Sequence, residues 1–130
     1  MIKPQIDTDQ HRLNELSFII NGCAMSVLNT IGHGFHEKIY ENALAIAFDK
    51  RNLQFSQQKQ FPISFEGQNV GIFIPDFVIE DQIILELKTI DKITNNEKGQ
   101  VLNYLRASKL SLGIILNFKH AKLDWQRIAL

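Results

Sequence analysis

The sequence lacks several features that mark particular classes of protein. A single cysteine, Cys23, cannot form an internal disulfide, so we expect a packed residue there and no disulfide-stabilised extracellular module. No run of about 18 apolar residues is present, so no membrane span is expected. Residues 1–10 lack the apolar stretch of a signal peptide. Together these absences predict a cytoplasmic protein.

A net charge is also missing, because 14 Lys and Arg balance 14 Asp and Glu. The charges are unevenly spread: residues 59–97 are rich in acids, and the segment from residue 98 onward is rich in bases. A solvated surface explains this distribution, and so does a cation site beside a phosphate-binding face. The length and an apolar fraction of 45% predict one globular domain over residues 1–130.

The first half of the chain is expected to contain two helices and three strands. Apolar residues recur at the helical period over residues 9–31, and a second helix is expected at about 35–51. Pro75 cannot donate a ladder hydrogen bond, so it marks a bulge or an interruption in the second strand. The three strands are expected at residues 61–67, 70–80 and 82–90.

The second half is expected to add one helix and the last strands. Thr94 and Glu97 form a capping box, which predicts a helix that runs to about Ser108. The apolar run at 112–118 predicts a buried strand parallel to its neighbour, and 124–129 is a candidate edge strand. An antiparallel meander followed by a helical crossover gives an α/β fold: a mixed sheet flanked by helices.

Two charged residues interrupt the aliphatic strand expected at residues 82–90. Glu86 and Lys88 are two residues apart, so their side chains share one face of the strand. One interpretation is a weak ion pair on an exposed face. The other is a functional site, because the aliphatic neighbours indicate burial on both faces, where charges usually pair or bind a metal.

A second carboxylate is expected close to Glu86. Asp76 lies on the preceding strand, and a turn at residues 80–82 places it about opposite Glu86 across the hairpin. Two opposed carboxylates repel unless a cation lies between them. Carboxylate oxygens suit Mg²⁺ or Mn²⁺ better than zinc.

These residues resemble a known signature. Pro-Asp at residues 75–76 followed by Glu-x-Lys at 86–88 resembles the PD-(D/E)XK nuclease-like superfamily. Within it, the motif carried by Gly34, Glu37 and Tyr40 resembles the GxxExxY family. The resemblance implies a restriction-endonuclease-like αβββαβ core with an extra N-terminal helix.

The resemblance also implies the roles of individual residues. Asp76 and Glu86 would bind Mg²⁺ or Mn²⁺, helped by the backbone carbonyl of Leu87. Glu37 would add a carboxylate, either directly or through water. Lys88 would orient the attacking water or stabilise charge on the phosphoryl oxygens. The cation would polarise the phosphate and lower the pKa of its bound water.

Four residues of the expected third helix are candidate contacts to a nucleic-acid substrate: Lys98, Gln100, Tyr104 and Arg106. Gln100 and Tyr104 are one turn apart and resemble the Gln-x-x-x-Tyr element of RecB-type nucleases. Each candidate also has a plainer interpretation. Glu37 and Gln100 alone read as polar helix residues, and Tyr40 reads as a packed side chain with a hydrogen-bonded hydroxyl.

The expected function is Mg²⁺-dependent hydrolysis of phosphodiester bonds in nucleic acid, with DNA favoured over RNA. The alternative is a catalytically silent nucleic-acid-binding or regulatory module on the same fold. A homodimer or a larger complex is also expected, since a domain of this size contacts few base pairs alone. Zinc is not predicted, because His33, His36 and Glu37 lack the His-Glu-x-x-His spacing and the histidines are expected at the surface.

Overall fold

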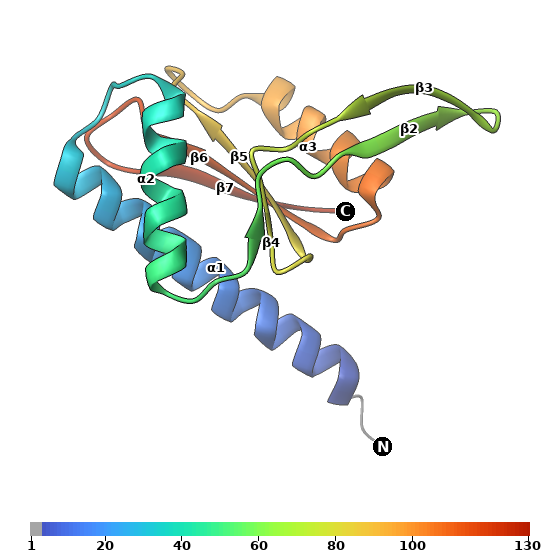
Figure 1. Ribbon diagram of the computed structural model, residues 1–130, viewed down its shortest axis with the longest axis horizontal. Coiled ribbons are helices and arrows are strands. Elements are labelled where there is room, and N and C mark those ends of the chain that lie inside the picture. The colour runs from blue at the N-terminus through green and yellow to red at the C-terminus, as the bar shows by residue number, and fades with distance from the viewer. Residues whose placement is uncertain (1–3) are drawn as a thin grey trace.

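A computed structural model describes the backbone of residues 4–130 and the side chains of residues 9–130 (Figure 1). Three helices and seven strands form in this part of the chain, and the predicted capping box at the start of α3 is present. In chain order the elements are α1 (Pro4–Ile31), α2 (Glu37–Lys50), β1 (Phe55–Ser56), β2 (Phe61–Phe65), β3 (Gln68–Phe73), β4 (Phe77–Ile79), β5 (Ile83–Lys88), α3 (Asn95–Ser108), β6 (Leu112–Asn117) and β7 (Asp124–Ala129).

Five strands form the main sheet in the order β1-β4-β5-β6-β7. Strand β5 is central and pairs in parallel with β6, while the other neighbours are antiparallel. The parallel pair requires a crossover, which α3 supplies between β5 and β6. The mixed sheet flanked by helices is therefore confirmed, as is the extra helix at the N-terminal side.

The prediction that three strands in the middle of the chain form one meander is wrong, because β2 and β3 lie outside the main sheet. Strands β2 and β3 pair only with each other and form a separate two-stranded sheet. The expected strand at 70–80 is interrupted, since β3 ends at Phe73 and β4 begins at Phe77, with Pro75 between them. The short strand β1 takes the edge position beside β4, and two residues are too few to show a period in the sequence.

Helices cover both faces of the main sheet (Figure 1). On one face, α1 and α2 pack over Ile83, Leu85 and Leu87 in a large apolar core that contains Tyr40. On the other face, α3 packs over Ile84 in a smaller core. The alternation expected for β5 is thus confirmed, and it sends Glu86 and Lys88 toward the α3 face.

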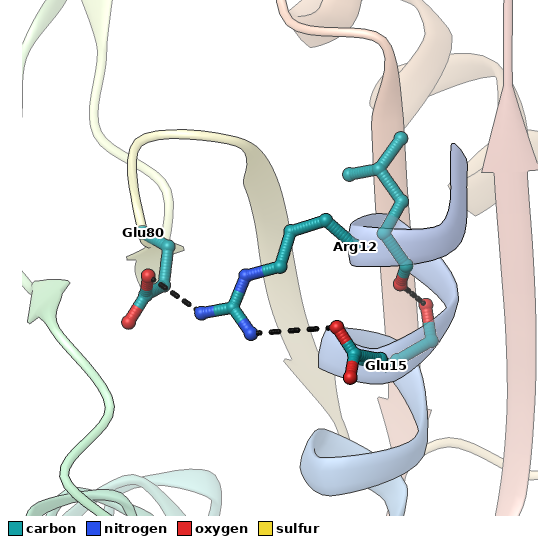
Figure 2. Close-up of polar contacts among 5 residues, drawn as sticks. Arg12, Glu15 and Glu80 are labelled. Carbon is teal, nitrogen blue, oxygen red and sulfur yellow. Dashed lines mark hydrogen bonds and ion pairs between the residues drawn. The ribbon is translucent and has the colours of Figure 1, made fainter. Parts of the chain in front are cut away.

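The long helix α1 is also tied to the sheet by a polar contact. Figure 2 shows Arg12 reaching from α1 to Glu80 in the turn between β4 and β5, with an Nη2–Oε1 distance of 3.0 Å. The other Glu80 oxygen accepts from the backbone N–H of Gln54 at 3.1 Å. The turn that sets the β4–β5 register is therefore held from two sides.

None of the helices in residues 4–130 combines the length and the apolar character that a membrane span requires.

Candidate active site

Two carboxylates are held against each other at the end of the β4–β5 pair. Phe77 pairs with Leu85, so the antiparallel register places Asp76 opposite Glu86, as the turn length predicts. The backbone N–H of Asp76 donates to Oε2 of Glu86 at 3.1 Å. The N–H of Leu87 donates to Oδ2 of Asp76 at 2.7 Å. The two acids are thus linked through each other's backbone.

The environment of both carboxylates opposes ionisation. Glu86 is only 8% exposed. Burial, followed by the negative charge of Asp76, raises the pKa of Glu86 to about 7. Burial also raises the pKa of Asp76, although the hydrogen bond from the Leu87 N–H opposes the increase. Two buried acids in contact can both be ionised at low cost only if a positive charge lies beside them.

Lys88 supplies part of that positive charge. It is the last residue of β5, it is half-buried, and its side chain leaves the same strand face as Glu86. Its charge lowers the pKa of both Asp76 and Glu86. Because Glu86 is buried, the alternative of an exposed strand face with a surface ion pair does not describe this strand.

Helix α2 brings two further acids toward the pair. Glu37, its first residue, is half-buried, and its charge raises the pKa of Asp76 and Glu86. Glu41 lies one turn later and affects Asp76 more strongly than Glu37 does. Sequence reasoning missed Glu41, although its spacing of four from Glu37 is a usable signal. Its carboxylate is oriented by Gln57, whose Nε2 donates to Oε2 at 2.9 Å.

A set of backbone contacts fixes the start of α2 against the end of β5. Gly34 has φ +86°, a conformation that favours glycine, and its N–H donates to the Phe118 carbonyl at 3.0 Å. The N–H of Phe118 in turn donates to the Lys88 carbonyl at 2.9 Å. Two hydrogen bonds therefore connect the turn before Glu37 to Lys88.

Tyr40 reinforces this connection from within α2. Its hydroxyl donates to the Gly32 carbonyl at 2.8 Å and accepts from the Phe35 N–H at 3.0 Å. Its ring is fully buried and stacks on Phe118. The interpretation of Tyr40 as a packed side chain with a hydrogen-bonded hydroxyl is confirmed, and the packing orients the helix that carries Glu37.

Comparison with known proteins adds an independent observation. The family model described as the PD-(D/E)XK nuclease superfamily matches residues 14–128. The chain belongs to the PD-(D/E)XK nuclease superfamily. No curated protein and no solved structure matches it. The match covers α1 from residue 14 through nearly all of β7, so it includes every element that positions the candidate site of this superfamily member.

The carboxylates of this nuclease-superfamily chain fit a hard divalent cation. Oδ1 of Asp76 and Oε1 of Glu86 make no hydrogen bond within the described residues. The carbonyl of Leu87 lies on the same strand edge as its N–H, which faces Asp76. Mg²⁺ is commonly held by one or two carboxylates, with water and phosphate oxygens completing its octahedron.

The structure does not assemble a larger cluster of metal ligands. Among the side chains of residues 9–130, no group of three or more His, Cys, Asp or Glu is arranged to hold a metal ion. The charge of Glu37 raises the pKa of both carboxylates, and its part in holding a metal stays a prediction.

Asn117 is a buried polar residue that sequence reasoning did not place at the site. It ends β6 opposite Lys88, and its side chain holds the loop that follows β5. Its Oδ1 accepts from the Ile90 N–H at 3.0 Å, and its Nδ2 donates to the Ile90 carbonyl at 2.8 Å. A second donation, to Asp124, ties the same residue to β7. Asn117 thus ties the backbone that follows Lys88 to β7.

The residues expected to contact substrate on α3 differ in their relation to the carboxylates. Tyr104 is half-buried; burial and then the charges of Glu86 and Asp76 raise the pKa of its phenol. Gln100 is exposed one turn earlier on the helix, and Lys98 is half-buried near its start. The exposed Arg106 donates to Oδ1 of Asn103 at 2.9 Å. Tyr104 therefore has an electrostatic connection to the two acids.

The remaining candidates behave as their plainer interpretations predict. His33, His36 and His120 are exposed. Cys23 is 4% exposed in the apolar core, and burial raises the pKa of its thiol.

Proposed function

We propose that this chain is a metal-dependent nuclease that hydrolyses phosphodiester bonds of DNA or RNA. The observation that carries the proposal is the buried, mutually bonded pair of Asp76 and Glu86, with Lys88 on the same strand. Burying two acids side by side costs stability, and a structural role would be served better by apolar residues. Because the chain belongs to a nuclease superfamily, catalysis of phosphodiester hydrolysis would explain why the pair is kept despite this cost.

Asp76 and Glu86 would hold Mg²⁺ or Mn²⁺ through their remaining oxygens, with the Leu87 carbonyl as a neighbouring ligand. Glu37 would contribute through an intervening water. When bound, the cation would supply a Lewis acid that polarises the phosphodiester and acidifies water. Its charge would also relieve the repulsion between the two carboxylates.

Lys88 would orient the attacking water and stabilise negative charge on the non-bridging phosphate oxygens. The water oxygen forms a new bond to phosphorus and the phosphodiester P–O bond breaks. The products are a phosphate monoester and a free hydroxyl group. Lys98, Gln100, Tyr104 and Arg106 are proposed to contact the nucleic acid from α3.

We also propose that the chain is a GxxExxY member of the superfamily. The contacts of the three motif residues support this. Gly34 adopts the positive φ that its hydrogen bond to Phe118 requires, and Tyr40 fixes the turn before Glu37. The motif then has a physical purpose, because it sets the position of Glu37 relative to β5.

The test is cleavage of labelled DNA and RNA with Mg²⁺ or Mn²⁺. We expect the wild-type chain to cleave at least one of them, and chelation of the metal to stop the reaction. Glu86→Gln and Lys88→Ala should each lower the rate by at least about 10²-fold, the usual effect of removing a catalytic group.

Glu80→Gln is the matched control, because it makes the same chemical change in the turn at the other end of β4. It should cleave at a rate close to that of the wild-type chain. Cleavage that is equal in wild type and Glu86→Gln, or binding without cleavage under either metal, would contradict the proposal and favour the silent binding module.

A further inference from the structure

A groove of about 910 Å³ lies between the β2–β3 hairpin and helix α3. Pro62, Ile63 and Ser64 of β2 form one wall, and one face of α3 forms the other. Figure 1 shows the hairpin extending past α3, away from the five-stranded sheet. The hairpin takes no part in the main sheet, so its effect on the molecule's surface is to create this second wall.

An aromatic stack joins the hairpin to Tyr104, which is one of the residues that line the groove. The rings of Phe61 and Phe73 stack with centroids 5.1 Å apart, and Phe73 stacks on Tyr104 at 4.1 Å. Tyr104 also lines the groove. The negative charges of Glu86 and Asp76 act on its phenol. Tyr104 therefore lines the groove and also lies within electrostatic range of the carboxylates.

The α3 wall carries groups that match the parts of a nucleotide. Gln100 and Asn103 present amides, which can both donate to and accept from base edges. Arg106 and Lys109 offer cations to phosphates, and none of the described residues that line the groove is acidic. The ring of Tyr104 and the aliphatic β2 wall suit the faces of bases.

We propose that this groove binds a single strand of nucleic acid that leads to the candidate active site. The inference rests on the proposed function for its substrate class and adds a preference for single strands. The volume falls in the range of about 300–1,000 Å³ typical of small-ligand pockets, which leaves room for a few nucleotides of one strand. A double helix, whose major groove alone is about 12 Å wide, hides the base faces that Ile63 and Tyr104 would contact.

Binding is tested by fluorescence anisotropy in EDTA, which prevents metal-dependent cleavage. The probes are a labelled single strand of about 12 nucleotides and the same sequence as a duplex. We expect the wild-type chain to bind the single strand at least about tenfold more tightly than the duplex at low salt. Ser64→Phe, which fills the groove without a change in charge, should weaken binding of the single strand.

The double variant Arg106→Gln with Lys109→Asn removes both cations of the groove. Asn is chosen because Lys109 has φ +65°, which Asn tolerates. Single-strand affinity should fall at least about tenfold, and the salt slope should decrease by about 1.4 for two lost phosphate contacts. Lys119→Gln with Lys122→Gln removes two exposed cations between β6 and β7 and should leave both quantities nearly unchanged.

Several results would overturn the inference: equal affinity for duplex and single strand, wild-type binding by the groove variants, or groove variants that alter only self-association in sedimentation. Cleavage in Mg²⁺ or Mn²⁺ separates this inference from the proposed function. Groove-dependent binding without cleavage supports the groove and contradicts the nuclease. Cleavage that the groove variants leave unchanged contradicts the groove alone.

Discussion

The rings of Tyr40 and Phe118 stack with centroids 4.3 Å apart and planes 8° from parallel. Tyr40 belongs to α2 and Phe118 directly follows β6, so the stack joins a helix to the central sheet. The backbone of Phe118 meanwhile bonds to Gly34 on one side and Lys88 on the other. This pair is therefore the link through which Glu37 and Lys88 keep a fixed relative position.

Tyr40→Phe tests this link, because it keeps the ring stack and removes the hydroxyl. The Gly32 carbonyl and the Phe35 N–H each lose a partner, so the free energy of unfolding should fall by about 1–2 kcal/mol. Cleavage should slow by roughly tenfold, within the effect that a small misplacement of catalytic groups produces. Urea unfolding and single-turnover cleavage measure the two effects.

Tyr104→Phe is the control for stability. Tyr104 is the other tyrosine of the chain, and its hydroxyl makes no hydrogen bond within the residues that the structure describes. Its removal should change the free energy of unfolding by less than about 0.5 kcal/mol. Equal stability losses for the two variants would show that the Tyr40 hydroxyl does not hold the turn.

The sequence predicted the parts of this fold that depend on local pattern. Period and capping located the helices, and the turn length fixed the register that places Asp76 opposite Glu86. It did not predict that β2 and β3 leave the main sheet. Alternation shows that a segment is extended but not which strand it pairs with, and pairing is a tertiary property.

Only the part of the site that depends on local strand geometry could be predicted from the sequence. Asp76, Glu86 and Lys88 lie on adjacent strands, so strand geometry brings them together. Glu41 and Asn117 come to the site through the packing of α2 and of the loop after β5. The spacing of Glu41 from Glu37 shows that the two share a helix face, but not what that face packs against. The motif identifies Glu37, but the effect of its charge on the two carboxylates depends on how α2 packs against the sheet.

Glu86→Gln should remove a loss of stability that the wild-type chain undergoes as the pH rises. The pKa of Glu86 is raised from 4.5 to about 7, so the folded state binds a proton more tightly than the unfolded state. Its contribution to stability is complete below about pH 4.5 and is lost as the pH rises toward 7. Without metal at pH 8, Glu86→Gln should be more stable than the wild type by up to about 3 kcal/mol. Urea unfolding in EDTA at pH 5.5 and pH 8 measures this difference.

Mg²⁺ should stabilise the wild-type chain at pH 8 and have much less effect at pH 5.5, where Glu86 is protonated. The cation binds the ionised carboxylates of the folded state, so it raises the melting temperature by mass action. Glu86→Gln should lose most of this response. An equal increase in melting temperature at both pH values, or in both proteins, would contradict a metal site at this pair.

Glu80→Gln should lower the free energy of unfolding at pH 8, whereas Glu86→Gln should raise it. The Glu80 carboxylate pairs with Arg12 at 3.0 Å, although Arg12 is 42% exposed and solvent screens the pair (Figure 2). The variant should therefore lose about 0.5–1 kcal/mol of stability. Salt should reduce the difference, since screening weakens the wild-type pair. A gain in stability, as expected for Glu86→Gln, would show that Arg12 does not stabilise the turn.

Gly113→Ala tests how closely α3 packs on the sheet. Gly113 lies in β6, and a Cβ added there would meet Cγ1 of Val101 at 2.5 Å. Val101 is 1% exposed and β-branched, so it cannot easily move aside. The substitution should cost about 1–3 kcal/mol by overpacking. Adding Val101→Ala should recover part of this loss, and a double-mutant cycle in urea measures the coupling.

Gly99→Ala provides the matched comparison within α3 itself. A Cβ at Gly99 meets nothing within 4 Å, and the residue is inside the helix. The free energy of unfolding should therefore increase by about 0.5–1 kcal/mol, because alanine favours the helix and restricts the unfolded chain. The same chemical change would thus alter stability in opposite directions at a packed position of β6 and at an open position of α3. A stabilising Gly113→Ala would mean that α3 can shift away from β6 to make room for the added methyl group.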